Sequence, residues 1–168
     1  MPTTPPPNPA PSPNAGSSEP PASPAPAVPT AARSSVPRTL GRLGLGATLI
    51  TAGIGHLRQP EEFLAQVPPF FPARDTVVGV SGYMEIALGA ALVLARRRRT
   101  TVGWIAAAFF VAVFPGNISQ LATRTDAFTL DTDLKRAIRL LFQPVLVLWA
   151  LWSTGAWRAW RESKAKRP

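Results

Sequence analysis

The sequence predicts an all-α protein, a four-helix transmembrane bundle with a disordered Pro-rich N-terminal tail. Residues 1–37 hold thirteen of the 20 prolines and almost no large apolar residue, so they cannot offset the entropy lost on ordering. Four apolar stretches of about 20 residues follow, the length that crosses a bilayer core as a helix. Arginines and lysines flank these stretches, as they do in membrane proteins. Residues 38–157 therefore form the predicted membrane domain.

Composition excludes several classes of function. The chain has no cysteine, which excludes disulfides, thiol redox chemistry and Cys-ligated metal clusters. A single histidine excludes a multi-His metal site within one chain, so we predict no metal site, and no residue is singled out as catalytic. The net charge of +9 would suggest a nucleic-acid partner in a soluble chain. Here the basic residues flank apolar stretches, so we expect the lipid bilayer as partner and no nucleic acid.

The first predicted span covers residues 39–57. Arg42 lies near its start, and we expect its side chain to snorkel to the membrane surface. Small residues recur at four-residue spacing at Ala47, Thr51 and Gly55, a pattern typical of close helix packing in lipid.

A loop over residues 58–75 separates the first two spans. Pro60 and the two glutamates after it predict the start of a short helix. Its apolar side would comprise Phe63, Leu64 and Val67. Two interpretations stay open: an interfacial segment that covers one end of the bundle, or a lid over a ligand pocket.

The second span covers residues 76–95 and the third covers residues 101–120. They are expected to form a tight antiparallel pair, because only a short arginine run separates them. Pro115 and Gly116 should kink or unwind the last turn of the third span. The run is a topology signal and a candidate site for anionic lipid, and it consists of Arg96, Arg97, Arg98 and Arg99.

The fourth span covers residues 137–155 and follows a polar loop. Tryptophans gather near its far end, as expected of an interfacial aromatic belt: Trp149, Trp152 and Trp157. Residues 158–168 form a basic tail.

The distribution of basic residues predicts the orientation. Twelve of the 18 lysines and arginines lie on the side of the two termini and the arginine run, and six lie in the other two loops. The positive-inside rule therefore places both termini in the cytoplasm.

Polar residues within the predicted spans fall in one layer, between the bilayer midplane and the outer surface. Glu85 lies near the midplane and is the one acidic residue inside a span. A charge there costs about 2.5–3.5 kcal/mol, so Glu85 should face the bundle interior, with Arg139 as its counter-charge. The full layer comprises His56, Ser81, Glu85, Asn117, Gln120, Arg139 and Gln143.

Three interpretations of this polar layer stay open. Its members could hydrogen-bond between helices and fix the register of the bundle. They could line a binding pocket that opens to the outer side or to the lipid. They could also form a proton pathway through Glu85.

Several short motifs resemble the DoxX-like family of small bacterial integral membrane proteins. They are GIGHLxxPxxF at residues 53–63, VP at 67–68, SGYMEIxLG at 81–89, the arginine run, and FPGNI at 114–118. The resemblance covers residues 39–155 and implies four transmembrane helices in a bacterial cytoplasmic membrane. The histidine, glutamate and asparagine positions of the family would correspond to His56, Glu85 and Asn117.

The resemblance also implies three candidate functions. The first is an accessory or binding protein with a polar pocket in the outer half of the bilayer. The second is the membrane subunit of a quinone-linked oxidoreductase, with quinone as the candidate cofactor. The third is a carrier of a small molecule or of protons. A homo-oligomer or a redox-complex partner is expected, because the bundle is small.

Overall fold

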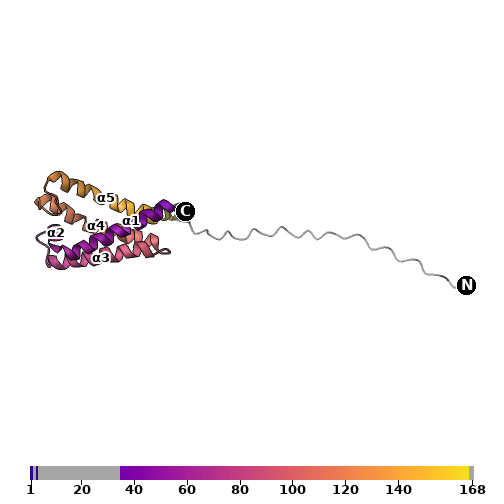
Figure 1. Cartoon of the computed structure of the whole chain (residues 1–168). Helices are drawn as coiled ribbons and strands as arrows, with labels where there is room; N and C mark the ends of the chain where they lie inside the picture. The colour runs from indigo at the N-terminus through magenta and orange to yellow at the C-terminus, as the bar shows by residue number, and fades with distance from the viewer. Residues whose placement is uncertain (2, 4–34, 167–168) are drawn as a thin grey trace. The chain divides into compact units, whose positions relative to one another are not determined.

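A computed structural model describes residues 1, 3 and 35–166, and these form helices and no strand (Figure 1). Residues 2 and 4–34 of the predicted disordered tail lie outside the described residues, and at its end Val36 and Pro37 already belong to the first helix. In chain order the helices are α1 (Val36–Arg58), α2 (Pro60–Leu64), α3 (Arg74–Leu94), α4 (Arg99–Thr123), α5 (Asp133–Thr154) and α6 (Ala156–Ala165).

Three of these helices, α3, α4 and α5, are long and apolar enough to cross a membrane. Helix α1 is as long, but its glycines, Arg42 and His56 make it less apolar. The outside of the long helices carries many large apolar side chains, which water would disfavour and lipid accommodates. We conclude that the chain is a membrane protein. These side chains include Val80, Tyr83, Met84, Leu94, Trp104, Ile105, Val111, Ile118, Ile138, Leu141, Val145 and Leu148.

Helices α1 and α3 pack side by side through four glycines (Figure 1). A methyl group at Gly53 would lie 2.5 Å from the carbonyl oxygen of Gly82, and one at Gly89 would lie 2.6 Å from that of Gly46. Gly46 and Gly53 are seven residues apart on α1, and Gly82 and Gly89 are seven residues apart on α3. The two backbones therefore touch twice along one antiparallel line of contact, which we call the glycine seam. The predicted Ala47–Thr51–Gly55 stripe is therefore wrong as the packing face, because Ala47 and Thr51 are exposed on α1.

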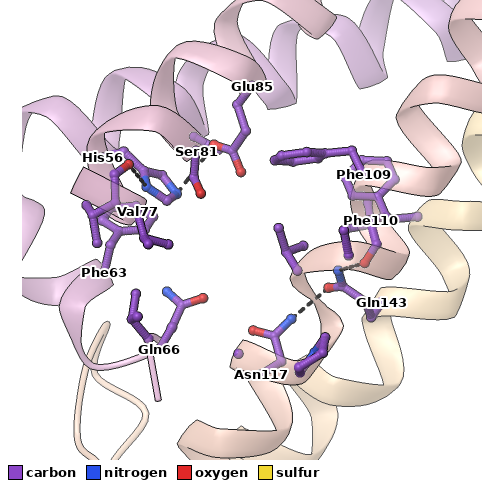
Figure 2. A pocket seen from close by; sticks show the side chains of 18 of the residues that line it. His56, Phe63, Gln66, Val77, Ser81, Glu85, Phe109, Phe110, Asn117 and Gln143 are labelled. Atoms are coloured by element: carbon purple, nitrogen blue, oxygen red, sulfur yellow. Dashed lines mark hydrogen bonds and ion pairs between the residues drawn. The ribbon is translucent and has the colours of Figure 1, made fainter. Parts of the chain in front are cut away.

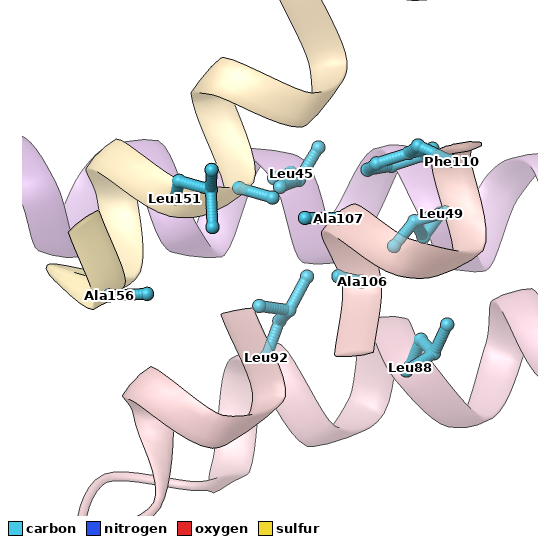
Figure 3. Packing of buried hydrophobic residues seen from close by; sticks show 10 residues of the cluster. Leu45, Leu49, Leu88, Leu92, Ala106, Ala107, Phe110, Leu151 and Ala156 are labelled. Carbon is cyan, nitrogen blue, oxygen red and sulfur yellow. The ribbon is translucent and has the colours of Figure 1, made fainter. Parts of the chain in front are cut away.

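Helices α4 and α5 form the second close pair, and an apolar core joins the two pairs. The core lies in the half of the bundle nearest α6 and the turn between α3 and α4, which we call the arginine end. Figure 3 shows leucines of α1 and α3 meeting alanines of α4. The buried members are Leu45, Leu49, Leu88, Leu92, Ala106, Ala107, Phe110, Ala150, Leu151 and Ala156.

Arg42 does not snorkel to the surface as the sequence predicted. Only 8% of Arg42 is exposed, and its guanidinium donates to the carbonyl oxygens of Leu92 and Val93. These are among the last carbonyls of α3, which have no partner within their own helix. Arg42 thus caps the C-terminal end of α3, where a cation is also favoured by the helix dipole.

Most of the predicted basic tail after α5 is helical. Gly155 ends α5 with φ of 74°, and α6 begins directly after it. Trp157 and Trp160 stack on α6 with ring centroids 4.9 Å apart. Trp149, a predicted member of the interfacial belt, donates its indole N–H to the Gly41 carbonyl oxygen of α1 at 2.9 Å.

The opposite end of the bundle, the α2 end, is closed by α2 and residues 124–132. Phe63 and Val67 are buried there, and Glu62 accepts a hydrogen bond from the backbone N–H of Phe128 at 2.6 Å. Lys135 pairs with Asp131 at 2.6 Å, and this hydrogen bond lowers the pKa of the Asp131 carboxyl. The short helix after Pro60 therefore covers the bundle by packing against the loop before α5.

Helix α4 continues past Pro115 to Thr123, so the expected unwinding at Pro115 and Gly116 does not occur. Gly116 has a packing role instead. A methyl group at this position would lie 2.9 Å from the backbone carbonyl oxygen of Gln66. The glycine therefore allows the chain after α2 to lie directly against α4.

Candidate functional site

A partly open cavity of about 590 Å³ lies between α1, α3, α4 and α5 on the α2 side of the core. Phe63, Gln66, Val67 and Phe71, from α2 and the segment after it, line its end. Most of the wall is apolar, with polar side chains at a few points (Figure 2). Cavities of this size and character are typical of sites for small molecules.

Six of the seven residues in the predicted polar layer line this cavity: His56, Ser81, Glu85, Asn117, Arg139 and Gln143. Figure 2 shows His56, Ser81 and Glu85 on one side, with Asn117 and Gln143 opposite. Gln120 is not in the wall of the cavity. It is buried near the end of α4, where its side-chain amide donates to the carbonyl oxygen of Thr125 at 3.4 Å.

His56 and Glu85 meet across the glycine seam of α1 and α3. The imidazole Nε2 lies 3.5 Å from a carboxyl oxygen of Glu85, and the two side chains are 12% and 13% exposed. A methyl group at Gly82 would lie 2.7 Å from Cβ of His56, so the glycine makes room for the histidine. Phe63 covers the imidazole, with ring centroids 3.6 Å apart.

The hydrogen bonding of His56 determines how protons are shared in this pair. Its Nδ1 lies 3.1 Å from the carbonyl oxygen of Val78, which only accepts, so Nδ1 carries a hydrogen. Nε2 then faces the Glu85 carboxyl at 3.5 Å, and no hydrogen bond joins the two. One further proton, on either Nε2 or the carboxyl, would leave the pair without net charge, which is the inexpensive arrangement within a membrane.

Arg139, predicted as the counter-charge of Glu85, acts on the Glu85 carboxyl through its positive charge, but from a distance. No ion pair joins the two within residues 35–166, and Arg139 instead donates to the side-chain oxygen of Gln66 at 2.9 Å. Its guanidinium also lies 4.6 Å from the ring centroid of Phe128. Arg139 is directed toward the α2 end because Gln66 and Phe128 approach it there, whereas α1 brings His56 to Glu85.

Asn117 and Gln143 form a hydrogen-bonded chain between α4 and α5. The Asn117 amide donates to the side-chain oxygen of Gln143 at 2.8 Å, and the Gln143 amide donates to the carbonyl oxygen of Phe110 at 2.7 Å. Both side chains are buried and satisfied in this chain. Their geometry matches the interpretation in which polar residues fix helix register.

Two polar atoms of the cavity region are buried without a hydrogen-bond partner. One is an oxygen of the Glu85 carboxyl, and the other is the side-chain nitrogen of Gln66. Native proteins leave few buried polar atoms unsatisfied, and each one calls for an explanation. Sequence reasoning missed Gln66, because it follows a short surface helix and only the approach of α4 brings it to the cavity.

The wall of the cavity suits an amphiphilic ligand more than an ion. Among the described residues, no three His, Asp or Glu side chains lie close enough together to hold a metal ion. Aromatic rings and aliphatic chains from four helices would surround an apolar body. Glu85, His56 and Gln66 would meet its polar group.

Comparison with known proteins identifies the family. No curated protein and no solved structure matches the chain. The family described as "Domain of unknown function (DUF8561)" matches residues 45–154, a range that contains the residues lining the cavity. Because the match covers more than half of the chain, the protein belongs to this DUF8561 family.

Proposed function

We propose that the protein is an accessory or binding protein of the DoxX-like type, located in a bacterial cytoplasmic membrane. Its function would be to hold a small amphiphilic molecule in the cavity beside Glu85. The observation that carries this proposal is the pair of unsatisfied polar atoms, the Glu85 oxygen and the Gln66 nitrogen, at an apolar cavity of about 590 Å³. A ligand would supply the hydrogen bonds that the protein itself leaves unmade.

The proposal includes α1 as a fourth transmembrane helix. α1 has 23 residues, packs against the whole of α3, and exposes Leu43, Ile54 and Leu57 on its other side. Of its three arginines, Arg38 and Arg58 lie at the two ends of the helix, and Arg42 is hydrogen-bonded inside the bundle. Both chain termini and the arginine end would then face the cytoplasm, and the cavity would lie in the outer half of the bilayer.

The same atoms favour a quinone as a second candidate, in a protein that serves as the membrane subunit of an oxidoreductase. A quinone carries carbonyl oxygens on an apolar ring and tail. One carbonyl would accept a hydrogen bond from the Gln66 amide, whose orientation is fixed by Arg139. A proton on His56 Nε2 or on the Glu85 carboxyl would be available to the other carbonyl.

A cavity-blocking variant tests the binding function. Val113 on α4 lines the cavity, whereas Val111 on the same helix is 61% exposed on the outer surface. We would purify the wild type, Val113→Trp and Val111→Trp from bacterial membranes in a mild detergent. Co-purifying small molecules would then be extracted and identified by mass spectrometry.

We expect an amphiphile at about one per chain with the wild type and Val111→Trp, and several-fold less with Val113→Trp. A quinone identified by its mass and absorbance would support the oxidoreductase subunit. Equal retention by all three proteins would contradict the cavity as the binding site. Absence of any amphiphile from well-folded wild type would contradict the binding function.

A further inference from the structure

A second, smaller cavity lies at the arginine end, away from the Glu85 cavity. Its volume is about 230 Å³, and it lies between the first turn of α1, the last turns of α5 and the first turn of α6. We call it the inner groove. Its lining residues are Arg38, Leu148, Leu151, Trp152, Gly155, Trp157 and Arg158.

The inner groove is positively charged, and no acidic residue lines it. Arg38 is partly buried and makes no hydrogen bond or ion pair with any residue that the structure describes. Arg158 has one acidic partner, Glu162, at 3.5 Å on the exposed side of α6. Two guanidinium groups from different helices thus face one small cavity, an arrangement that suits an anion and above all a phosphate.

The floor of the inner groove leaves room between these cations. Gly155 has no side chain, and a methyl group built there would have the Arg38 guanidinium as its nearest neighbour, at 3.9 Å. The tryptophans Trp152 and Trp157 are both about half exposed. Indole rings favour the interface between bilayer and water, which is the depth of a lipid phosphate.

An apolar track runs from the inner groove along the outer face of α5. Leu141, Val145, Leu148 and Trp152 are all exposed, and their spacing of three or four residues puts them on one face of the helix. Leu148 belongs to both the groove and this track. An acyl chain could therefore continue from the groove toward the middle of the bilayer without leaving apolar surface.

From these observations we propose that the inner groove binds one anionic phospholipid of the cytoplasmic leaflet. Its phosphate would lie between Arg38 and Arg158, and one acyl chain would follow Leu148 and Val145. The proposal rests on the four-span arrangement proposed above, but not on any ligand in the Glu85 cavity. Binding there would join α1, α5 and α6 at the arginine end.

Lipid retention measured by native mass spectrometry tests this site. The full chain would be prepared in detergent and titrated with phosphatidylglycerol or with phosphatidylcholine. The test variant is Arg38→Gln/Arg158→Gln. The matched control is Arg97→Gln/Arg161→Gln, which removes the same charge from arginines at the same end that do not line the groove.

The wild type and the control should retain one phosphatidylglycerol, with at least tenfold preference over phosphatidylcholine. The test variant should bind phosphatidylglycerol about tenfold or more weakly, because each basic residue near an anionic surface contributes about 1 kcal/mol. Should the double variant not fold, the single exposed change Arg158→Gln gives the same test with a smaller loss.

Three results would overturn the proposal. The first is equal binding of the two lipids by the wild type, and the second is equal loss in the test and control variants. The third is displacement of the lipid by millimolar inorganic phosphate, which would show a phosphate site without a lipid. The Val113→Trp variant should retain phosphatidylglycerol normally, so failure of the Glu85 cavity and failure of the inner groove are distinguishable.

Discussion

Polar side chains inside the bundle fall into two kinds, which predict opposite effects of mutation. Gln143 has its hydrogen bonds made within the bundle, and Arg42 is bonded to the end of α3. Glu85 and Gln66 each keep one buried polar atom without a partner. The first kind stabilises the fold, whereas the second costs stability, a cost that the proposed ligand would offset.

Replacing Glu85 by methionine should separate stability from binding. Glu85→Met removes an oxygen that is buried and unsatisfied, so we expect the thermal unfolding midpoint in detergent to stay the same or rise. Retention of the amphiphile should fall several-fold. Tryptophan fluorescence would follow unfolding, with Glu61→Met on the exposed side of α2 as the control. A clear loss of stability with normal retention would instead assign Glu85 a structural role.

Replacing Gln143 by methionine should do the reverse. Two hydrogen bonds are lost, and the Asn117 amide is left without its acceptor. Membrane hydrogen bonds contribute about 0.6 kcal/mol each, so the free energy of unfolding should fall by about 1 kcal/mol or more. Leu141→Met on the lipid-facing side of α5 is the control and should be neutral. Equal stability of the two variants in a reversible unfolding titration would contradict this role.

The sequence predicted most of the residues that line the cavity, but not which of them contact one another. The position along each predicted span identified His56, Ser81, Glu85, Asn117 and Gln143, because a polar residue inside an apolar stretch can be recognised from the sequence alone. The partner of Glu85 was not visible, because the glycine seam of α1 and α3 decides which side chain reaches it.

Among the helices, the packing of α1 against α3 depends on how the glycines of the two helices match, and not on the apolar character of either helix alone. The seam puts Gly46 against Gly89 and Gly53 against Gly82, each too close for any side chain. Close backbone contact of this kind maximises van der Waals attraction, which drives helix association where lipid removes the hydrophobic effect. The seam also sets the distance between His56 and Glu85.

Adding one methyl group to this seam should separate the helices. In Gly53→Ala the new Cβ would lie 2.5 Å from a backbone oxygen, which cannot rotate away. We expect a loss of about 1–3 kcal/mol in the free energy of unfolding. Gly79→Ala in α3 is the matched control, because its Cβ would have no neighbour within 4 Å. A variant Gly53→Ala as stable as Gly79→Ala would show that the backbones do not touch.

The glycines of this seam are also recognisable in the sequence, but a second pattern of small residues on α1 was equally consistent with a packing face. Ala47, Thr51 and Gly55 have the spacing expected of a packing face, and so do Gly46 and Gly53. One helix alone does not tell which stripe faces a neighbour. The choice is made by α3, whose Gly82 and Gly89 match the second stripe in reverse order.

For the molecule as a whole, the space between the four long helices is filled toward the arginine end and hollow toward the α2 end. The leucine and alanine core and Arg42 hold the helices together at the first end. At the other end, α2 and residues 124–132 close the bundle but leave the cavity beneath them.

Charge at the arginine end should determine the orientation in the membrane. Replacing Arg96, Arg97, Arg98 and Arg99 by glutamine leaves eight basic residues on that side against six on the other. We expect a mixed orientation, because the bias that the positive-inside rule requires is then small.

Because the chain has no cysteine, single introduced cysteines can report its orientation in the membrane. A membrane-impermeant maleimide on intact cells should label Thr129→Cys and spare Ser163→Cys while the four arginines are present. Both should be labelled in part once the arginines are replaced. An unchanged labelling pattern would show that other residues set the orientation.

The sequence by itself determined the helical, membrane character of the protein and the polar residues that interrupt its apolar stretches. The lengths of apolar stretches and the positions of charges are local properties of the chain, so the sequence alone is enough to identify them. Only the tertiary structure decided that Glu85 meets His56, that Arg42 caps α3, that Gln66 reaches the cavity and that α6 closes the inner groove. Each of these depends on which faces of two helices touch, and side chains far apart in sequence settle that through packing.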